Sequence, residues 1–407
     1  MPWLPPICDT SRRTQVLKLI EHIDDFLLST QSKSSDLMYG SVGIAKYYAC
    51  RYHQSKNDFF ADHCRLLIEK VINENAEIPL TDWSYGTGVM GIIWGIGHLI
   101  ENGIIDGQIN DVIDNDLYNN AFIFSNKSLQ IGNYDYLHSG LGAVLLLHHL
   151  DIAQRKKYCE DIISDLERLS IKESNSQSIF WYKSPVITNH GNSLKAIDMG
   201  LAHGLPSVIV SLSSLSSIGA DTEKCKQLVE SCFSWMISKK ENVIKERFYF
   251  PISIDGASKS FNPDDLRWCY SDLGIAMSFY LSGTNLKLNH IKELGLEMAL
   301  SSAQRSNTFK MNESHLCHGT AGVAHMFNRF FNYTGMPIFQ EASVYWFEQT
   351  LKNFNPKLSS GFLSWQGSNY GWVEQAGLLE GVAGIGLAMI SAISDVEPKW
   401  DRCLLLS

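Results

Sequence analysis

Two cysteines occupy equivalent places in a sequence pattern, a histidine directly follows one of them, and the three residues could together bind a metal ion. Cys317 and His318 stand five and four residues before Gly322, and Cys269 stands five residues before Gly274. Each glycine opens an apolar stretch. Thiolate and imidazole ligands select zinc over magnesium or calcium, and three protein ligands leave a fourth position open for a reacting group. The residues therefore predict a catalytic zinc site rather than a structural one.

These residues belong to a short pattern that occurs seven times along the chain. The pattern has two small residues separated by two others, and an apolar residue follows it directly. We number each copy from its second small residue, position zero, which falls at Gly43, Gly91, Gly142, Ser207, Gly274, Gly322 and Gly384. Successive copies are 48 to 67 residues apart, which suits two helices and their connections. The sequence therefore predicts seven helical hairpins.

Two kinds of helical segment alternate in these hairpins. Residues 15–29, 58–73 and 221–237 are amphipathic with a helical period, whereas the segments after the small residues, such as 142–147, are apolar nearly all round. One helix of each hairpin should therefore be half exposed and the other fully buried. Because the buried helices show no polar face for a solvated groove, we expect an all-α, double-layered α/α toroid. It should form a single domain over residues 1–407.

Two stretches depart from the helical pattern. Residues 179–182 and 247–252 are aromatic and β-prone, and polar turn residues flank them. They lie in the two longest gaps between copies of the small-residue pattern. Small β-rich insertions are therefore expected around residues 175–195 and 245–262.

Other polar residues occupy the stretch just before the small residues. Position −4 is held by Tyr39, Thr87, His138, His203, Tyr270, His318 and Glu380, and Asp135 lies seven residues before Gly142. If the buried helices converge at one end of the toroid, these side chains surround the proposed metal and are candidates for moving protons. His203 stands out because it holds the place that His318 holds two copies later. For His138 and Glu380 a packing role is the simpler interpretation.

Composition and charge exclude several classes of protein. The chain is 45% hydrophobic and 19% charged, so it can bury a large core. A net charge of −9 without long runs of lysine or arginine argues against nucleic acid or an anionic membrane as the main partner. No apolar run reaches the roughly 18 residues of a membrane span, and the first residues do not resemble a secretory signal. We expect a cytoplasmic protein.

The nine cysteines include no Cys-x-x-Cys pair and do not resemble a disulfide framework. Most are expected to be small buried residues. With nine cysteines, the matched positions of Cys269 and Cys317 could also arise by chance, and the adjacent His318 is what favours a metal site. Trp268 and Trp365 could line the cavity around the candidate residues, but core packing is the simpler interpretation for both.

The sequence resembles the lanthionine synthetase C-like family, the cyclases of lanthipeptide biosynthesis, in their standalone class I form. Residues 202–204, 268–270, 317–322 and 379–386 carry the resemblance, in the family's order and over most of the chain. The Cys-His-Gly motif within 317–322 is specific. The resemblance implies a seven-repeat α/α toroid that can carry a small β insertion, in agreement with the expectation above.

The resemblance also implies roles for individual residues. Zinc ligands of the family match Cys269, Cys317 and His318, and its acid–base group matches His203, Asp135 and Tyr270. The family has an arginine a few residues before the zinc cysteine. Here Arg267 is the nearest candidate and is out of register, so a catalytic role for it does not follow from the resemblance.

The implied function is that of a zinc-dependent lanthionine synthetase. Zinc would deprotonate a cysteine thiol of a lanthipeptide precursor, and the sulfur would add to a dehydroalanine or dehydrobutyrine of the same peptide. The resulting enolate needs a proton, for which His203 is the expected acid, with Asp135 setting its tautomer. The expected partners are the dehydrated precursor peptide, a dehydratase and an export transporter.

Other functions remain open on the residues alone. Zinc could activate glutathione or another small thiol for addition to dehydrated residues. The toroid could instead be a glycoside hydrolase with Asp135 and Glu380 as its two carboxylates, although the matched cysteines would then have no purpose. A peptide-binding scaffold with structural zinc would need a fourth protein ligand, which the sequence does not offer.

Overall fold

The helices and strands fall into two compact units. The computed structural model describes residues 2–77, 81–174, 176–183, 186–187, 193–240, 249–255, 258–260, 266–308 and 310–407. Unit 1 comprises Met1–Asp82, Gly86–Val112 and Leu300–Asp401, and unit 2 comprises Trp83–Tyr85, Ile113–Ala299 and Arg402–Ser407. The single-domain organisation of residues 1–407 stays a prediction.

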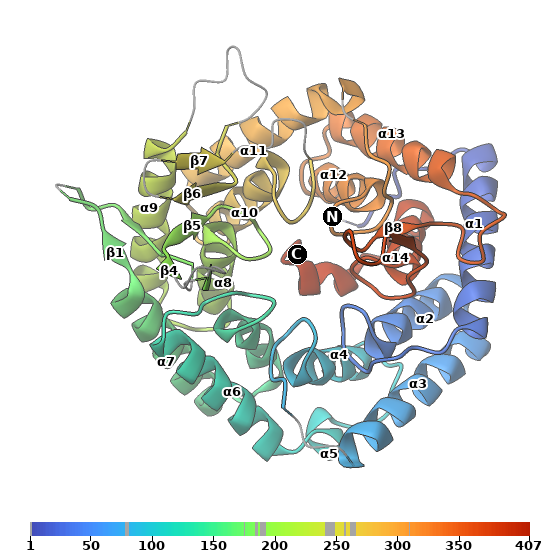
Figure 1. Cartoon of the computed structure of the whole chain (residues 1–407), viewed down its shortest axis with the longest axis horizontal. Coiled ribbons are helices and arrows are strands. Elements are labelled where there is room, and N and C mark those ends of the chain that lie inside the picture. Colours follow the sequence, from blue (N-terminus) through green and yellow to red (C-terminus); the bar gives the residue numbers. More distant parts are fainter. Residues whose placement is uncertain are drawn as a thin grey trace. The chain divides into compact units, whose positions relative to one another are not determined.

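Unit 1 has two layers of helices. The elements that lie or begin in it are α1 (Thr10–Ser29), α2 (Ser41–Ser55), α3 (Asp58–Glu77), α4 (Val89–Glu101), α5 (Ile109–Val112), η2 (Ser306–Thr308), α12 (Thr320–Thr334), α13 (Pro337–Asn353), β8 (Ser364–Trp365), β9 (Trp372–Val373), α14 (Val382–Ile393) and η3 (Lys399–Leu404). The helices α2, α4, α12 and α14 are buried along most of their length, and α1, α3 and α13 cover them (Figure 1). The last buried helix, α14, packs directly against the first, α2. The first and the last buried helices of the chain therefore lie side by side in this unit.

Unit 2 repeats the same layering. Its elements are α6 (Asn115–Gln130), η1 (Gly140–His149), α7 (Ile152–Leu169), β1 (Ile171–Lys172), β2 (Ile179–Phe180), β3 (Val186–Ile187), β4 (Ser193–Leu194), β5 (Ala196–Asp198), α8 (Leu205–Ser217), α9 (Thr222–Ser238), β6 (Ser253–Asp255), β7 (Ser258–Ser260), α10 (Asp272–Asn285) and α11 (Asn289–Gln304), which begins here. Of these, η1, α8 and α10 are buried, and α8 packs between the other two. The third buried segment is a 3₁₀ helix, where an α-helix was expected.

The small-residue pattern correctly predicts where all seven buried helices begin. The first small residue is the N-cap in each copy, namely Gly40, Gly88, Ser139, Gly204, Ser271, Gly319 and Gly381. The second small residue allows close approach. A Cβ atom at Gly384 would overlap the carbonyl oxygen of Leu378 and lie 2.7 Å from Cδ1 of Leu316. Small residues are thus needed where the loop of one hairpin meets its neighbour.

Backbone hydrogen bonds join equivalent positions of neighbouring hairpins in unit 1. The N–H of Cys317 donates to the carbonyl of Leu379 (3.1 Å), Leu379 donates to Met38 (2.8 Å), and Met38 donates to Gly86 (3.2 Å). All four residues stand five positions before their zero residue. The repeat numbering taken from the sequence is therefore the spatial register of these loops.

The β elements lie in and near the two stretches where they were expected. Strands β1 and β2 form one antiparallel hairpin, and β3 and β4 form another. A three-stranded sheet has the order β5-β6-β7, with Ile197 opposite Ile254. Part of the second stretch, 247–248, lies outside the described residues. Strand β5 ends at Asp198, and the chain then continues directly into the loop that carries His203.

No helix within the described ranges has both the length and the apolar character that crossing a lipid bilayer requires.

Candidate active site

Cys317 and His318 lie in the loop that enters α12 and are held close together there. Cys317 is 9% exposed, and its sulfur lies within 4.8 Å of a ring nitrogen of His318. The loop turns tightly, because a Cβ atom at Gly319 would lie 2.6 Å from the carbonyl oxygen of His315. A thiol and an imidazole thus converge just before a buried helix begins.

Glu313 fixes the orientation of His318. Its Oε2 atom lies 2.7 Å from Nε2 of His318 and 3.5 Å from Nε2 of His315, and its Oε1 atom accepts from the backbone N–H of Trp365 (2.7 Å). Burial by itself raises the pKa of the Glu313 carboxyl, but hydrogen bonds from the two imidazoles and from Trp365 hold that pKa well below its usual range. The charged carboxylate of Glu313 therefore accepts a hydrogen bond from Nε2–H of His318. A metal ion bound by this histidine would be coordinated by Nδ1.

Two further residues at position −4 lie beside Cys317 in unit 1. Glu380 accepts a hydrogen bond from Nε2 of Gln366 (2.9 Å). Loss of hydration, followed by the nearby Glu380 carboxylate and Cys317 thiol, raises the pKa of the Tyr39 phenol above its ordinary value. Tyr39 is therefore close enough to feel both Glu380 and Cys317, and His318 lies beside the Cys317 sulfur.

Asp135 and His203 form a hydrogen-bonded pair in unit 2. Oδ2 of Asp135 lies 2.9 Å from Nδ1 of His203, and its Oδ1 accepts from the backbone N–H groups of Leu137 (3.0 Å) and His138 (2.9 Å). Burial raises the pKa of Asp135, but the hydrogen bond and charge of His203 outweigh it and leave that pKa below its ordinary value. The ionised carboxylate of Asp135 thus fixes the ring of His203 through Nδ1. The other ring nitrogen, Nε2, faces away from Asp135.

Tyr270 joins this group through a second carboxylate. Its hydroxyl donates to Oδ2 of Asp198 (2.9 Å), which also accepts from Nζ of Lys183 (2.8 Å), and its ring centre lies 6.0 Å from that of His203. Burial and the charge of Asp198 raise the pKa of Tyr270 well above its ordinary value, so the phenol stays protonated. Cys269, the preceding residue, is 8% exposed in the same unit.

The sequence interpretation missed Glu313 and Asp198, although a signal for both was present. They stand nine residues before their zero positions, and this position is polar in all seven copies: Ser34, Asp82, Asn133, Asp198, Asp265, Glu313 and Gln375. The backbone explains part of the pattern, because the carbonyls of Ser34, Asp82, Asn133, Glu313 and Gln375 accept from the first residues of their helices. In these five copies the residue at this position therefore lies beside the first turn of the buried helix.

The two tryptophans near the site have different environments. Trp268 is buried, and its indole N–H donates to the carbonyl of Leu404 (2.8 Å), as expected for core packing. Trp365 is 45% exposed, so the expectation of core packing was wrong for it. Its strand, β8, belongs to a surface hairpin with β9. Arg267 is exposed.

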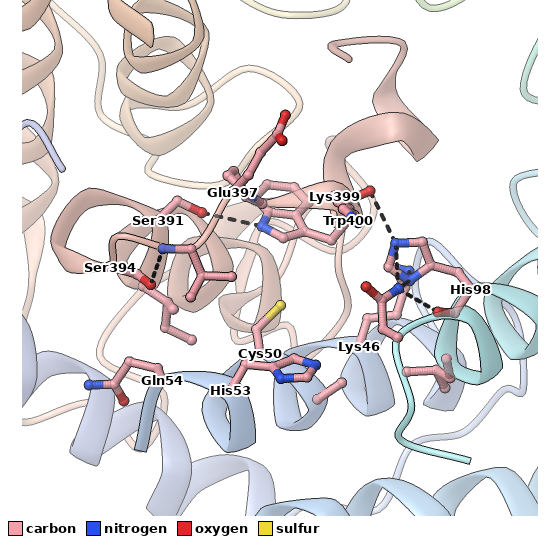
Figure 2. A pocket seen from close by; sticks show the side chains of 16 residues that line it. Lys46, Cys50, His53, Gln54, His98, Ser391, Ser394, Glu397, Lys399 and Trp400 are labelled. Atoms are coloured by element: carbon pink, nitrogen blue, oxygen red, sulfur yellow. Dashed lines mark hydrogen bonds between the residues drawn. The ribbon is translucent and has the colours of Figure 1, made fainter. Parts of the chain in front are cut away.

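A separate cavity of about 160 Å³ lies in unit 1 at the opposite ends of the buried helices. Figure 2 shows its lining side chains, which include Lys46 and Cys50 from α2, His98 from α4, and Trp400. Nζ of Lys46 lies 2.9 Å from Nδ1 of His98, and burial raises the pKa of Cys50 to about 12, so its thiol stays protonated. This cavity adjoins the C-terminal parts of α2 and α4, whereas the candidate residues precede N-termini. It is therefore not part of the candidate site.

The chain is similar to known proteins in its sequence family and in its fold. A family model described as "Lanthionine synthetase C-like protein" matches residues 31–405. A solved chain named "Nisin cyclase" is similar with a TM-score of 0.73 at 19% identity, covering 98% of this chain and 98% of that chain. A sugar epimerase from a ruminal bacterium reaches a TM-score of 0.47 at 11% identity, covering 94% and 98%, and carries no argument. No curated protein sequence matches the chain.

The nisin cyclase likeness concerns the fold, because the sequence identity is low. It confirms the predicted class, an α/α toroid of paired helices with small β elements. The family match is independent of that likeness and covers almost the entire length of the chain. The chain therefore belongs to the lanthionine synthetase C-like family.

Proposed function

We propose that the protein is a zinc-dependent lanthionine synthetase that closes thioether rings in a dehydrated precursor peptide. Membership of the family supports an enzyme of lanthionine cyclase type. The observation that carries the proposal is the pairing of Cys317 with a histidine whose second ring nitrogen is held by a charged glutamate. This is the arrangement that protein metal sites use to orient a ligating imidazole.

The proposed zinc ligands are Cys269, Cys317 and His318. Two of them converge in unit 1, and Cys269 stands at the same repeat position as Cys317 in the preceding hairpin. In unit 1, backbone hydrogen bonds join the residues at this position in neighbouring hairpins. The equivalent position of Cys269 therefore supports it as the third ligand. Bound there, zinc would supply a Lewis acid that converts an incoming peptide thiol into a thiolate.

The proposed acid is His203, oriented by Asp135. The thiolate sulfur adds to the β-carbon of a dehydroalanine or dehydrobutyrine, and the electron pair of the double bond moves to Cα as an enolate. Protonation of Cα by Nε2–H of an imidazolium completes the addition, while the ionised Asp135 at Nδ1 stabilises the charged ring before the transfer. Tyr270, protonated and bound to Asp198, would support the group as a neutral donor.

The peptide substrate gives the protein its proposed setting. A dehydratase would have to act first, because the acceptor double bonds arise by loss of water from serine and threonine. An export transporter would take the cyclised product from the cytoplasm, which is the location we propose.

One observation disfavours a glycoside hydrolase: both oxygens of Asp135 are occupied by hydrogen bonds, so it is poorly suited to act as a free carboxylic acid.

Cyclisation does not change the mass of the peptide, so the test follows the loss of a free thiol. A synthetic peptide with one dehydroalanine and one cysteine would be incubated with the protein and then alkylated for mass spectrometry. We expect Cys317→Ala to lose both stoichiometric zinc and thioether formation, whereas Cys64→Ala, which replaces another buried cysteine, retains both. Full cyclisation by a metal-free Cys317→Ala protein would end the proposal. Addition of glutathione to a peptide that lacks cysteine, without ring closure, would favour the small-thiol alternative.

A further inference from the structure

An aromatic surface stands beside the candidate site in unit 1. It is carried by residues 364–373, which we call the aromatic hairpin and which contain strands β8 and β9. Trp365, Trp372 and Tyr370 are 45%, 47% and 77% exposed. Neighbouring apolar side chains of this size on a surface generally mark a place where a ligand or partner binds.

The aromatic hairpin is a preformed structure. Trp365 and Trp372 are directly opposite in the antiparallel register, with ring centres 5.6 Å apart at an angle of 59°. Gly367 and Gly371 adopt positive φ angles of 78° and 66° in the turn, and the N–H of Gln366 donates to the carbonyl of Gly371 (2.9 Å). Little ordering of the hairpin would therefore be needed when a ligand binds.

Two hydrogen bonds fasten the aromatic hairpin to the candidate site. The backbone N–H of Trp365 donates to Glu313, the carboxylate that holds His318. The side chain of Gln366 donates to Glu380, which follows Leu379, the residue whose carbonyl accepts from the N–H of Cys317. The aromatic hairpin is therefore attached directly to the side chains that surround the loop with Cys317 and His318.

The chemistry of the surface indicates what binds there. Residues 363–373 include no charged side chain and offer two indoles, one phenol and the polar groups of Gln366, Ser368 and Asn369. Nucleic acid would require cations, so it does not fit. Loss of water from serine or threonine removes a hydroxyl and leaves a flat, unsaturated side chain, which makes a peptide more apolar and better able to stack on aromatic rings. We infer that the aromatic hairpin binds the dehydrated segment of the precursor peptide and presents it to the site.

This inference rests on the proposed function, and its test separates the two. Wild type, Tyr370→Ala/Trp372→Ala and Tyr370→Phe/Trp372→Phe proteins would be compared with Ile131→Ala, which truncates another exposed apolar residue. Fluorescence anisotropy would measure binding of a labelled dehydroalanine peptide and of the same peptide with serine in its place. The expected result is at least tenfold weaker binding of the dehydroalanine peptide to the double-alanine protein, with near-normal binding to the Phe and Ile131→Ala proteins. In cyclisation assays KM should rise by a similar factor while kcat and zinc content stay unchanged.

Equal binding by wild type and the double-alanine protein would overturn the inference, as would equal wild-type affinity for the dehydroalanine and serine peptides. If the double-alanine protein binds peptide normally but loses self-association by light scattering, the surface binds a second copy of the chain and the inference is wrong. Failure of the proposed function has a different signature: wild-type protein would bind the dehydroalanine peptide yet form no thioether.

Discussion

Nε2 of His318 lies 2.7 Å from Oε2 of Glu313, a residue five positions earlier in the same loop. The contact is a charge-assisted hydrogen bond, and it determines which ring nitrogen faces away from the glutamate. The proposed metal ligand thus depends on a residue that would not itself touch the metal.

Glu313→Gln should weaken zinc binding about 10- to 100-fold, because the amide holds the imidazole less firmly and makes it less basic. Competition with a chromophoric chelator measures this affinity without reference to turnover. Glu374→Gln is a matched control, since Glu374 also accepts from a backbone N–H in this region, that of Ser360, without contacting a histidine. Equal zinc affinity in the wild-type and Glu313→Gln proteins would remove Glu313 from the site.

His203→Ala should lower kcat of thioether formation by about 10²- to 10⁴-fold, because the enolate loses its positioned acid. Zinc content should be unchanged, as His203 is not among the proposed ligands. Asp135→Asn should lower kcat by a smaller factor, because the ring keeps its place but loses the charge that stabilises the imidazolium. Turnover equal to wild type in His203→Ala would exclude this histidine as the acid.

The free energy of unfolding should depend on a buried ion pair far from the candidate residues. Asp401 accepts from Nε of Arg329 (2.5 Å) and Nε2 of His325 (2.7 Å), and all three side chains are buried. Asp401→Asn removes the buried carboxylate and leaves Arg329 with the half-exposed Glu397, and it should cost up to about 3–5 kcal/mol at neutral pH. Chemical denaturation measures the loss, and the exposed Asp395→Asn serves as control.

The same carboxylate predicts a pH dependence of stability. Burial raises the pKa of Asp401, but the charge of Arg329 and the hydrogen bond from His325 hold it well below its ordinary value. A group with a lowered pKa in the folded state stabilises the fold above its unfolded value, about 3.9, and this contribution is lost as the pH falls toward the folded value. Wild-type stability should therefore fall below about pH 4, and the Asp401→Asn protein should show a shallower fall.

Gly384→Ala should destabilise unit 1 by more than Gly335→Ala. A Cβ atom at Gly384 would overlap the carbonyl of Leu378, so the loop beneath α14 would have to move. Gly335 has a φ of 69°, but no atoms lie within 4 Å of the place that an alanine methyl group would take, so only backbone strain of about 1–2 kcal/mol is expected there. Thermal unfolding of both variants provides the comparison, and equal melting temperatures would contradict the packing argument.

The helix starts could be predicted because steric contact alone fixes them. Where loop and neighbouring hairpin meet, as at Gly384, no larger residue fits, and this requirement is visible in one sequence. The pairing of Asp135 with His203 was implied by the family resemblance, and the structure brings the two side chains into contact within unit 2. Their catalytic roles, and zinc binding by Cys269, Cys317 and His318, stay predictions.

Other features could not be read from the chain because they depend on tertiary contacts. The 3₁₀ form of η1 is one, because its apolar sequence does not differ in kind from those of the buried α-helices. The exposure of Trp365 is another, because a two-residue strand is too short to show which face is buried. Glu313 and Asp198 differ from both: their shared repeat position was visible, but only the structure shows what their carboxylates bind.

The backbone ladder through Cys317, Leu379, Met38 and Gly86 has a consequence for how such a site could change over time. The hydrogen bonds between these loops use main-chain atoms only, so they form equally well with cysteine, leucine, methionine or glycine at this position. The residue type that could bind a metal ion is thereby independent of the hydrogen bonds that join the loops. A cysteine could therefore be gained or lost at any of these four positions without breaking the hydrogen bonds that join the loops.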